Sequence, residues 1–307
     1  MIAGDLERAI EQYDRAIGLN PENALYYYAR GLARLKSREF ARAVEDFKQA
    51  TTLNPRSSMA FFGQGQAHVG INEFDRAIAD FNEAIKLLPG NSAAYAIRGG
   101  AYIAKRDYAR ATEDIDQAIK LDPLCYVGFN SRGLIYDLKG EHDRAIADYN
   151  RAIELSPTPR TAEAYVWRSN AYRRKRDYDR AMQDLDQALK LDSRNISALN
   201  NRCYVQAIAG AFDKALVYCN EALRIRPNNA SILDSRGFTY LRMGSLDDAI
   251  AAYNAALQID QKMASSLYGR GTAKRLKGET AGGEADIAGA KAIRPSIADE
   301  MAQAGIN

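Results

Sequence analysis

The sequence has little of the chemistry that catalytic and metal-binding sites require. Only two of its 307 residues are histidine and three are cysteine. The cysteines, at 125, 203 and 219, cannot all pair within one chain, and their spacing matches no zinc or redox motif. No P-loop, GxGxxG, HExxH, CxxC or GxSxG sequence occurs. We therefore expect a chain that is not an enzyme and that holds no metal and no cofactor.

A one-sided charge and long apolar runs are also missing. Lysine and arginine number 42 against 39 aspartate and glutamate residues, which leaves a net charge of +3. This balance gives no support to nucleic-acid or membrane-surface binding, so we expect neither partner. No run approaches the ~18 apolar residues of a membrane span, and no basic segment followed by an apolar stretch marks a signal peptide.

Prolines are few, but seven of the eight follow one period. Those from 21 to 157 are spaced by 34 residues, and the intervals from 157 to 227 and from 227 to 295 are 70 and 68. Pro159 lies in the stretch TPRT (158–161), which supplies two extra residues. Such a period predicts a repeat protein. The phasing gives a half repeat at 1–23, a closing segment at 298–307, and eight repeats at 24–57, 58–91, 92–125, 126–161, 162–195, 196–229, 230–263 and 264–297.

Each repeat is predicted to form two helices. In FDRAIADFNEAIKLLP apolar residues recur at i, i+3, i+4 and i+7, which is a helical and not a strand period, and the proline ends the second helix. Glycine or asparagine recurs at repeat position 15, where a left-handed residue ends the first helix. Arginine stands there in three repeats (Arg38, Arg106, Arg176), so we expect those turns to be strained or differently formed.

Small and large side chains also recur at fixed repeat positions. Alanine holds position 27 in all nine second helices and position 20 in eight, glycine is the commonest residue at position 8, and aromatic residues recur at positions 4 and 24. With tyrosine at position 11 and proline at position 32, this pattern resembles the tetratricopeptide repeat. The resemblance covers nearly the whole chain. It implies an all-α fold, an α-solenoid in which about 8.5 helix-turn-helix hairpins stack into a right-handed superhelix, with the first helices lining a concave groove.

One position departs from the family pattern. Position 7, commonly leucine, is arginine in seven repeats, and position 23 is aspartate in six. We expect each arginine to pair with a nearby aspartate or with helix-end carbonyls as a structural ladder, the alternative being a row of ligand-binding arginines. The two histidines, His68 and His142, are also expected to be structural. Cys203 and Cys219 are expected to be buried and inert, and Cys125 more exposed.

Binding is expected at groove positions that vary while the scaffold repeats. In the family these are mainly positions 2, 5, 9, 12 and 13 of the first helix. Amide side chains there suit an extended peptide backbone, since each offers a donor and an acceptor, and arginines suit an acidic side chain or a chain-end carboxylate. Position 5 has no lysine, so the family's clamp for chaperone tails is not expected. The candidate peptide-binding residues are Tyr28, Phe62, Asn130, Asp137, Asn170, Arg173, Arg174, Asn200 and Tyr204.

These observations predict a non-catalytic scaffold that binds a protein or peptide segment in its groove. One alternative is a self-assembling module that forms a homodimer through the half repeat at 1–23, whose apolar face has no preceding helix. Another is a regulatory arm of an enzyme whose catalytic domain is missing from this chain. We favour truncation as the reason for the half repeat, and we expect the segment 298–307 to be a capping helix. The phrase DRAIADYNRAI is similar to bacterial members of the family, which favours a cytoplasmic protein, or a periplasmic one if a signal segment was removed.

Overall fold

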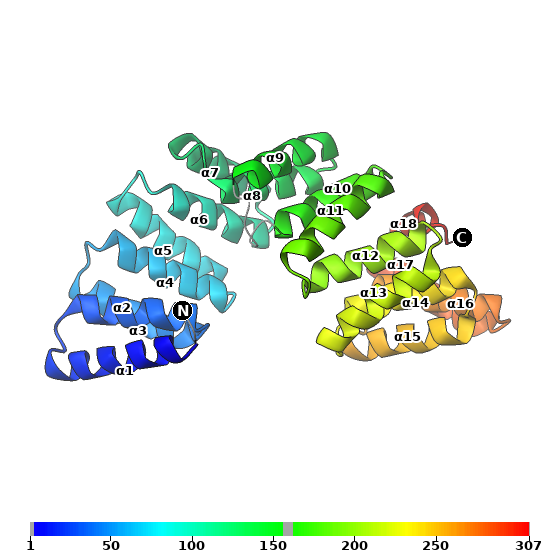
Figure 1. The fold of residues 1–307 in the computed structure, drawn as a ribbon, viewed down its shortest axis with the longest axis horizontal. Helices are drawn as coiled ribbons and strands as arrows, with labels where there is room; N and C mark the ends of the chain where they lie inside the picture. Colours follow the sequence, from blue (N-terminus) through cyan, green and yellow to red (C-terminus); the bar gives the residue numbers. More distant parts are fainter. Residues whose placement is uncertain (1–2, 156–161, 307) are drawn as a thin grey trace. The chain divides into compact units, whose positions relative to one another are not determined.

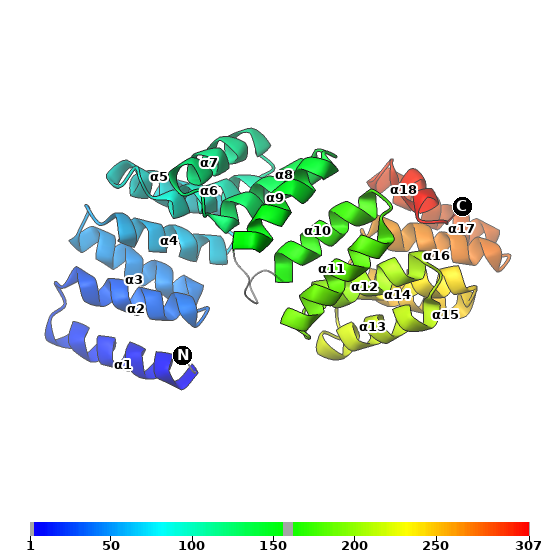
Figure 2. The ribbon, with the colours of Figure 1, turned by 45° about the horizontal axis from the view of Figure 1, so that its top comes forward.

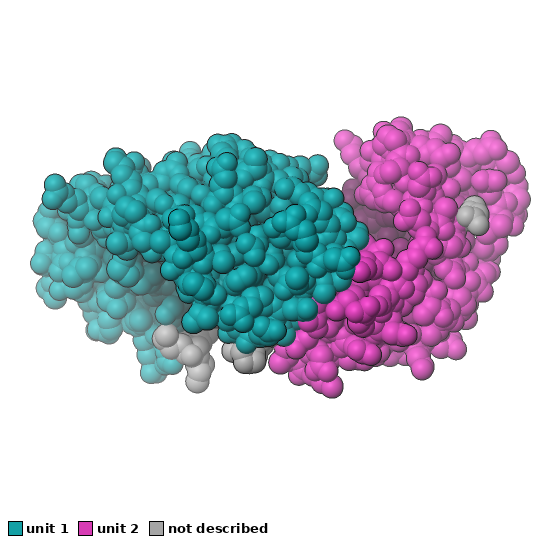
Figure 3. Space-filling model, turned by 90° about the horizontal axis from the view of Figure 1, so that it is seen from above, with its two compact units in different colours: residues 1–155 teal, residues 156–307 magenta. Residues whose placement is uncertain are grey.

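The computed structural model describes residues 3–155 and 162–306, and all regular structure in these ranges is α-helical. The predicted two-residue insertion in TPRT (158–161) lies outside the described residues. The chain divides into two compact units, residues 1–155 and 156–307, which are described separately (Figure 3). Helical hairpins follow one another through both units, which confirms the predicted all-α solenoid class.

The first unit contains nine helices within its described residues (Figure 1). A single helix, α1, comes first, and four hairpins follow. The bounds are α1 Ala3–Leu19, α2 Ala24–Lys36, α3 Phe40–Leu53, α4 Ser58–Gly70, α5 Phe74–Leu87, α6 Ser92–Ala104, α7 Tyr108–Leu121, α8 Tyr126–Leu138 and α9 His142–Leu155.

The second unit also contains nine helices within its described residues, four hairpins and a short last helix (Figure 2). The bounds are α10 Ala162–Arg174, α11 Tyr178–Leu191, α12 Ile196–Ile208, α13 Phe212–Ile225, α14 Ala230–Met243, α15 Leu246–Ile259, α16 Ala264–Leu276, α17 Thr280–Ile293 and α18 Ile297–Gln303.

The first helices of the hairpins form one layer in each unit. In the first unit α2 contacts α4, α4 contacts α6 and α6 contacts α8, and in the second α10, α12, α14 and α16 do the same in turn. Within the described residues the second helices have no comparable contacts with one another. Because the first helices of neighbouring hairpins approach one another more closely than the second helices do, each stack bends toward the layer of first helices. We call the surface of this layer that points away from the second helices the inner face.

Glycine at repeat position 8 makes room for the large residue at position 24 of the same hairpin. A Cβ added at Gly65 would lie 2.7 Å from the Phe81 ring, and one at Gly237 would lie 2.8 Å from the Tyr253 ring. Both aromatic side chains are fully buried. Positions 8 and 24 are therefore packing partners, and the small residue at one fits the large residue at the other.

The turns between the two helices of a hairpin need a left-handed residue, as predicted. Arg38, Arg106, Arg176 and Asn72 have φ values of 60–62°, and Gly140, Gly210, Gly244 and Gly278 take the same region in the other turns. For the three arginines this conformation is strained, because a Cβ is disfavoured there.

The arginines at position 7 form the predicted structural ladder in five repeats. Arg132 shows the arrangement: Nε donates to Asp148 Oδ2 at 2.8 Å, Nη2 donates to Oδ1 at 2.9 Å, and Nη1 reaches Asp116 of the preceding repeat at 2.9 Å. The hydrogen bonds that Arg132 donates to Asp148 and Asp116 raise the pKa of its guanidinium. The same bidentate pair occurs in four more hairpins, as Arg30–Asp46, Arg98–Asp114, Arg168–Asp184 and Arg270–Asp286.

A double-mutant cycle on Arg132→Ala and Asp148→Ala is expected to give a coupling of about 1–2 kcal/mol in the free energy of unfolding, because the pair is bidentate and mostly buried. Urea unfolding of the four chains measures it. The exposed pair Arg151–Glu154, 3.1 Å apart on the second helix of the same hairpin, is the control and should give no more than about 0.5 kcal/mol. Equal couplings for the two pairs would remove the ladder's structural role.

The expectation that Cys203 and Cys219 are inert thiols is wrong. Both are fully buried, as predicted, but they form a disulfide between α12 and α13. They occupy positions 8 and 24 of their repeat, the positions that touch in the other hairpins, so the fold itself brings the two sulfurs together. Cys125 is the free, partly exposed cysteine. Burial raises the pKa of its thiol, so it is a weak nucleophile at neutral pH.

Both histidines have structural roles, as predicted. His68 is buried on α4, and its Nδ1 lies 2.6 Å from Asp80 Oδ2 on α5. His142 begins α9, and its Nδ1 lies 2.8 Å from Asp137 Oδ1 at the end of α8. Each histidine therefore ties together the two helices of its own hairpin.

Candidate functional site

Four of the residues predicted to bind a peptide lie on the inner face of the second unit. Asn170 and Arg173 are on α10, and Asn200 and Tyr204 are on the neighbouring α12. The Asn170 Oδ1 accepts a hydrogen bond of 3.1 Å from Asn201 Nδ2. The Arg173 guanidinium carbon lies 5.4 Å from the centre of the Tyr204 ring, a cation–π contact. Asn200 precedes Asn201 and lies one helical turn before Tyr204 on α12, and we call Asn170, Arg173, Asn200 and Tyr204 the polar cluster.

An amide oxygen in this cluster has no internal partner. Asn200 Oδ1 is buried and has no hydrogen bond within the described residues. The equivalent atom of Asn130, at the same repeat position on α8 of the first unit, is also buried and unpartnered, and the Asn130 side chain is only 6% exposed. A buried acceptor without a partner costs free energy, so such atoms are expected to meet a donor from a ligand or from water.

The Tyr204 ring links the polar cluster to an apolar stretch of the inner face. Its centre lies 4.7 Å from that of Phe238 on α14, with the ring planes tilted by 35°. Burial raises the pKa of the Tyr204 hydroxyl; the charge of Arg173 opposes this, whereas Asp234 and Glu300 add to it. The hydroxyl therefore stays protonated and can act as a hydrogen-bond donor at neutral pH.

Asp234 on α14 extends the cluster and was not among the predicted site residues. Burial raises its pKa to about 6, against hydrogen bonds from Ser266 and Ser265 that favour the charged form. The Ser266 hydroxyl donates to Asp234 Oδ1 at 2.5 Å. The sequence signal for Asp234 was its repeat position, since it occupies position 5, as Asn130 and Asn200 do.

The other predicted residues are placed less favourably for binding. In the first unit, Tyr28 and Phe62 are partly buried against Phe47 and Phe81, with ring centres 5.9 Å apart in both pairs. Asp137 is 5% exposed and bonded to His142, so its carboxylate is engaged within the chain. Arg174, at the end of α10 in the second unit, is exposed.

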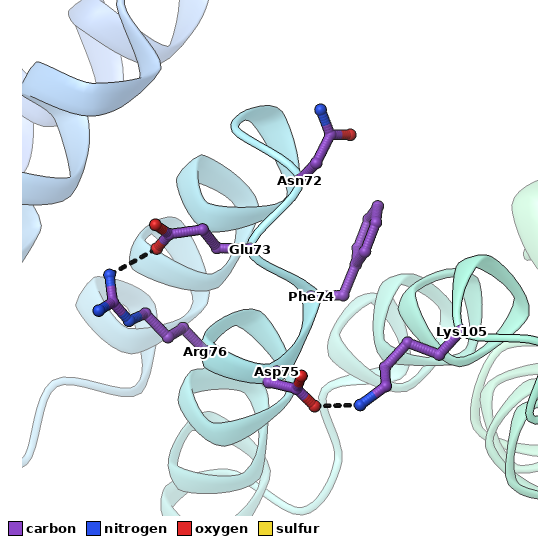
Figure 4. A pocket seen from close by; sticks show the side chains of 6 residues that line it. All are labelled: Asn72, Glu73, Phe74, Asp75, Arg76 and Lys105. Carbon is purple, nitrogen blue, oxygen red and sulfur yellow. Dashed lines mark hydrogen bonds and ion pairs between the residues drawn. The ribbon is translucent and has the colours of Figure 1, made fainter.

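A separate hollow of about 330 Å³ lies at the turn before α5 (Figure 4). Its lining consists of Asn72, Glu73, Phe74, Asp75, Arg76 and Lys105. Asp75 pairs with Lys105, and Glu73 Oε2 accepts from Arg76 Nη1 at 2.7 Å. Its charges neutralise one another in pairs, and none of the nine predicted residues lines it.

Neither a membrane-spanning helix nor a metal-binding cluster is present in residues 3–155 and 162–306. No helix in these ranges is both long and apolar enough to cross a bilayer. They also contain no group of three or more histidine, cysteine, aspartate or glutamate side chains arranged to hold a metal ion.

Family models match along most of the chain. They are described as tetratricopeptide repeat or TPR repeat models, and they match residues 1–37, 28–92, 92–123, 126–159, 162–195 and 230–263. No curated protein matches the sequence.

Solved structures of low sequence identity share the fold. A chain of the APC/C hetero-tetramer Cut9-Hcn1 matches 77% of this chain with a TM-score of 0.70 and 21% identity. A tetratricopeptide repeat protein from Parabacteroides merdae matches 77% with a TM-score of 0.64 and 19% identity, and yeast Tom70 matches 90% with a TM-score of 0.61 and 19% identity. The match covers 46% of the Cut9-Hcn1 chain, 93% of the Parabacteroides chain and 60% of Tom70.

Proposed function

Because the chain belongs to the tetratricopeptide repeat family, we propose that it is a non-catalytic scaffold that binds a peptide or protein segment on the inner face of its repeats. The observation that carries this proposal is the buried, unpartnered Oδ1 of Asn200, one turn before Tyr204 on the helix that contacts Asn170 and Arg173 of α10. An extended peptide has unpaired backbone N–H groups, and one of them would satisfy this acceptor.

The chemistry of the cluster suggests which peptide it prefers. Asn200 Oδ1 accepts, the Tyr204 hydroxyl donates, and Arg173 carries a fixed positive charge. Arg174 adds a second positive charge at the exposed end of α10. We expect an extended segment with an acidic side chain or a chain-end carboxylate near Arg173, and an apolar side chain against the Tyr204 and Phe238 rings.

Selection of random peptides displayed on phage against the immobilised chain tests this proposal. Enriched peptides are expected to carry Asp or Glu and to bind the chain in fluorescence polarisation. Asn200→Ala and Arg173→Glu should each weaken binding about tenfold or more, since each removes a polar contact from a shielded site.

Lys190→Glu is the matched control, because Lys190 is exposed on the second helix α11 and the substitution changes the charge as Arg173→Glu does. Lys190→Glu should change the peptide affinity by no more than about twofold, since an exposed surface charge contributes little. If no peptide is enriched, or if all three variants bind equally well, the inner face of α10 and α12 is not the binding site.

Two alternatives from the sequence stay predictions. The first is a homodimer through the half repeat at 1–23, which gel filtration of the chain tests directly. The second is a regulatory arm of an enzyme. Of the two locations expected from the sequence, the cytoplasm and the periplasm, the Cys203–Cys219 disulfide favours the oxidising one, the periplasm.

A further inference from the structure

The segment 297–306 lies on the inner face of the last two repeats. Helix α18 contacts α16 more than α17 (Figure 2), whereas a first helix that continues the stack contacts the preceding second helix more, as α16 contacts α15 more than α14. The last turn of α18 reaches farther, because Arg242 Nη1 on α14 donates to the Ala304 carbonyl at 2.6 Å. Arg242 stands at repeat position 13, one of the groove positions of the family.

Apolar side chains of this segment belong to the same buried cluster as groove residues. Ile297, Met301, Ala304 and Ile306 are each at least 94% buried, in one cluster with residues of the inner face. Three of those residues stand at repeat positions 9, 12 and 5, and they are Phe238, Leu241 and Tyr268.

Burial along the repeats shows that the segment covers this part of the face. Position 9 is partly exposed in the first six repeats, at Leu32, Gln66, Gly100, Leu134, Asn170 and Tyr204. In the last two repeats the same position is held by Phe238 and Thr272, which are only 2% and 6% exposed. Position 9 is therefore shielded in the last two repeats, where the segment 297–306 packs on the inner face.

The end of the segment is shaped to fit Arg242. Gly305 has a φ of +84°, and the Ile306 amide donates to the Met301 carbonyl at 2.9 Å, which closes the helix in a Schellman motif. A Cβ at residue 305 would lie 2.7 Å from Arg242 Nη1. Glycine therefore serves both the turn and the close approach of the guanidinium.

We propose that the inner face of α14 and α16 is a docking site for a short amphipathic helix, and that the segment 297–306 is its internal ligand. The partner that fits is a protein segment with apolar side chains at i, i+4 and i+7, followed by glycine and an aliphatic residue, as in Ile297, Met301, Ala304, Gly305 and Ile306. Such a partner binds by replacing the segment. This inference rests on the proposed function, because it assigns the neighbouring part of the same face.

A labelled synthetic peptide with the sequence of residues 296–307 tests the exchange on the full chain. The wild-type chain should bind it weakly, because the covalently linked segment competes at an effective concentration of about millimolar. Met301→Asp places a charge in the buried contact and should release the segment. The Met301→Asp chain is then expected to bind the peptide at least tenfold more tightly than the wild-type chain does.

Ala302→Asp is the matched control, because it adds the same charge to an exposed position of the same helix. Its peptide affinity should equal that of the wild type, and a peptide that itself carries Met301→Asp should bind neither chain. A folded Met301→Asp chain that does not bind the wild-type peptide would overturn the inference. Peptides from the display selection would still bind at Asn200 in that case, so the two proposals fail separately.

Hydrogen exchange of the wild-type chain tests the same inference without the Met301→Asp variant, in case that variant does not fold. The amides of Ala304, Gly305 and Ile306, which are hydrogen-bonded in the segment, should exchange through a local opening at least tenfold faster than the slowest amides of α16. Exchange of both sets at one common rate would show that the segment is a fixed cap of the last repeat and would overturn the inference.

Discussion

Replacing Phe81 with alanine is expected to lower the free energy of unfolding by about 3–5 kcal/mol, the usual cost of removing a fully buried aromatic side chain. Phe81 is 0% exposed and fills the space that Gly65 leaves between α4 and α5. Its ring also supports Phe62, whose centre lies 5.9 Å away. The loss therefore affects a hairpin core and a predicted peptide-binding residue together. Urea unfolding followed by circular dichroism measures it.

Phe74→Ala is the matched comparison for Phe81→Ala. Phe74 begins the same helix α5, but it is only partly buried and lines the hollow in Figure 4. Phe74 buries less apolar area on folding than Phe81 does, so Phe74→Ala should lower the free energy of unfolding by less than half as much. Similar costs for the two variants would mean that the packing of positions 8 and 24 does not dominate the stability of the hairpin.

Reducing the Cys203–Cys219 disulfide is expected to lower the free energy of unfolding of the second unit by roughly 3 kcal/mol. The two cysteines are 16 residues apart, so the bond closes a short loop and restricts the unfolded chain. Urea unfolding with and without dithiothreitol measures the difference. Thiol titration of the unreduced, denatured chain should give one free thiol, that of Cys125.

The repeat itself supplies a control for the disulfide. Cys203→Gly with Cys219→Phe restores the pair of residues that fills positions 8 and 24 in other hairpins, such as Gly65 and Phe81. This double variant should be insensitive to dithiothreitol and should recover part of the lost stability through buried aromatic surface. Three free thiols in the unreduced wild-type chain would contradict the disulfide.

Phe81→Ala and reduction of the disulfide act on different states of the chain. Phe81→Ala weakens the folded state by leaving a cavity, whereas reduction of the disulfide mainly enlarges the unfolded ensemble. In a stack of repeats each hairpin contacts only its neighbours, so both losses should remain within one unit. Hydrogen exchange resolved by helix should show faster opening of α4 and α5 in the first case and of α12 and α13 in the second.

Much of the fold could be predicted because the determinants are periodic. Apolar residues at helical spacing define each helix, and the 34-residue period places equivalent helices side by side. The Arg132–Asp148 pair could be predicted for the same reason, since a spacing of 16 residues recurs in hairpin after hairpin. Glycine, asparagine or a strained arginine at position 15 likewise marks each turn, because only a left-handed residue ends the first helix there.

The candidate site could be predicted only in part. Asn170, Arg173, Asn200 and Tyr204 were found by repeat position, and the structure brings them together on two adjacent helices. Repeat position alone did not show that Asp137 is engaged by His142, because that contact depends on a residue particular to one turn. It also did not show that Cys203 and Cys219 meet, because that requires knowing that positions 8 and 24 touch.

The helices and their turns follow from residue spacing alone, since each depends on contacts that recur at fixed separations, and the resemblance to the tetratricopeptide repeat implies the layer of first helices. Which groove positions remain open depends instead on contacts that form in the folded chain. Arg242 and Ala304 are 62 residues apart and belong to no period, and their contact depends on the path of the chain after Pro295. Contacts of this kind do not repeat along the chain. They form through packing in three dimensions, so no spacing in the sequence predicts them.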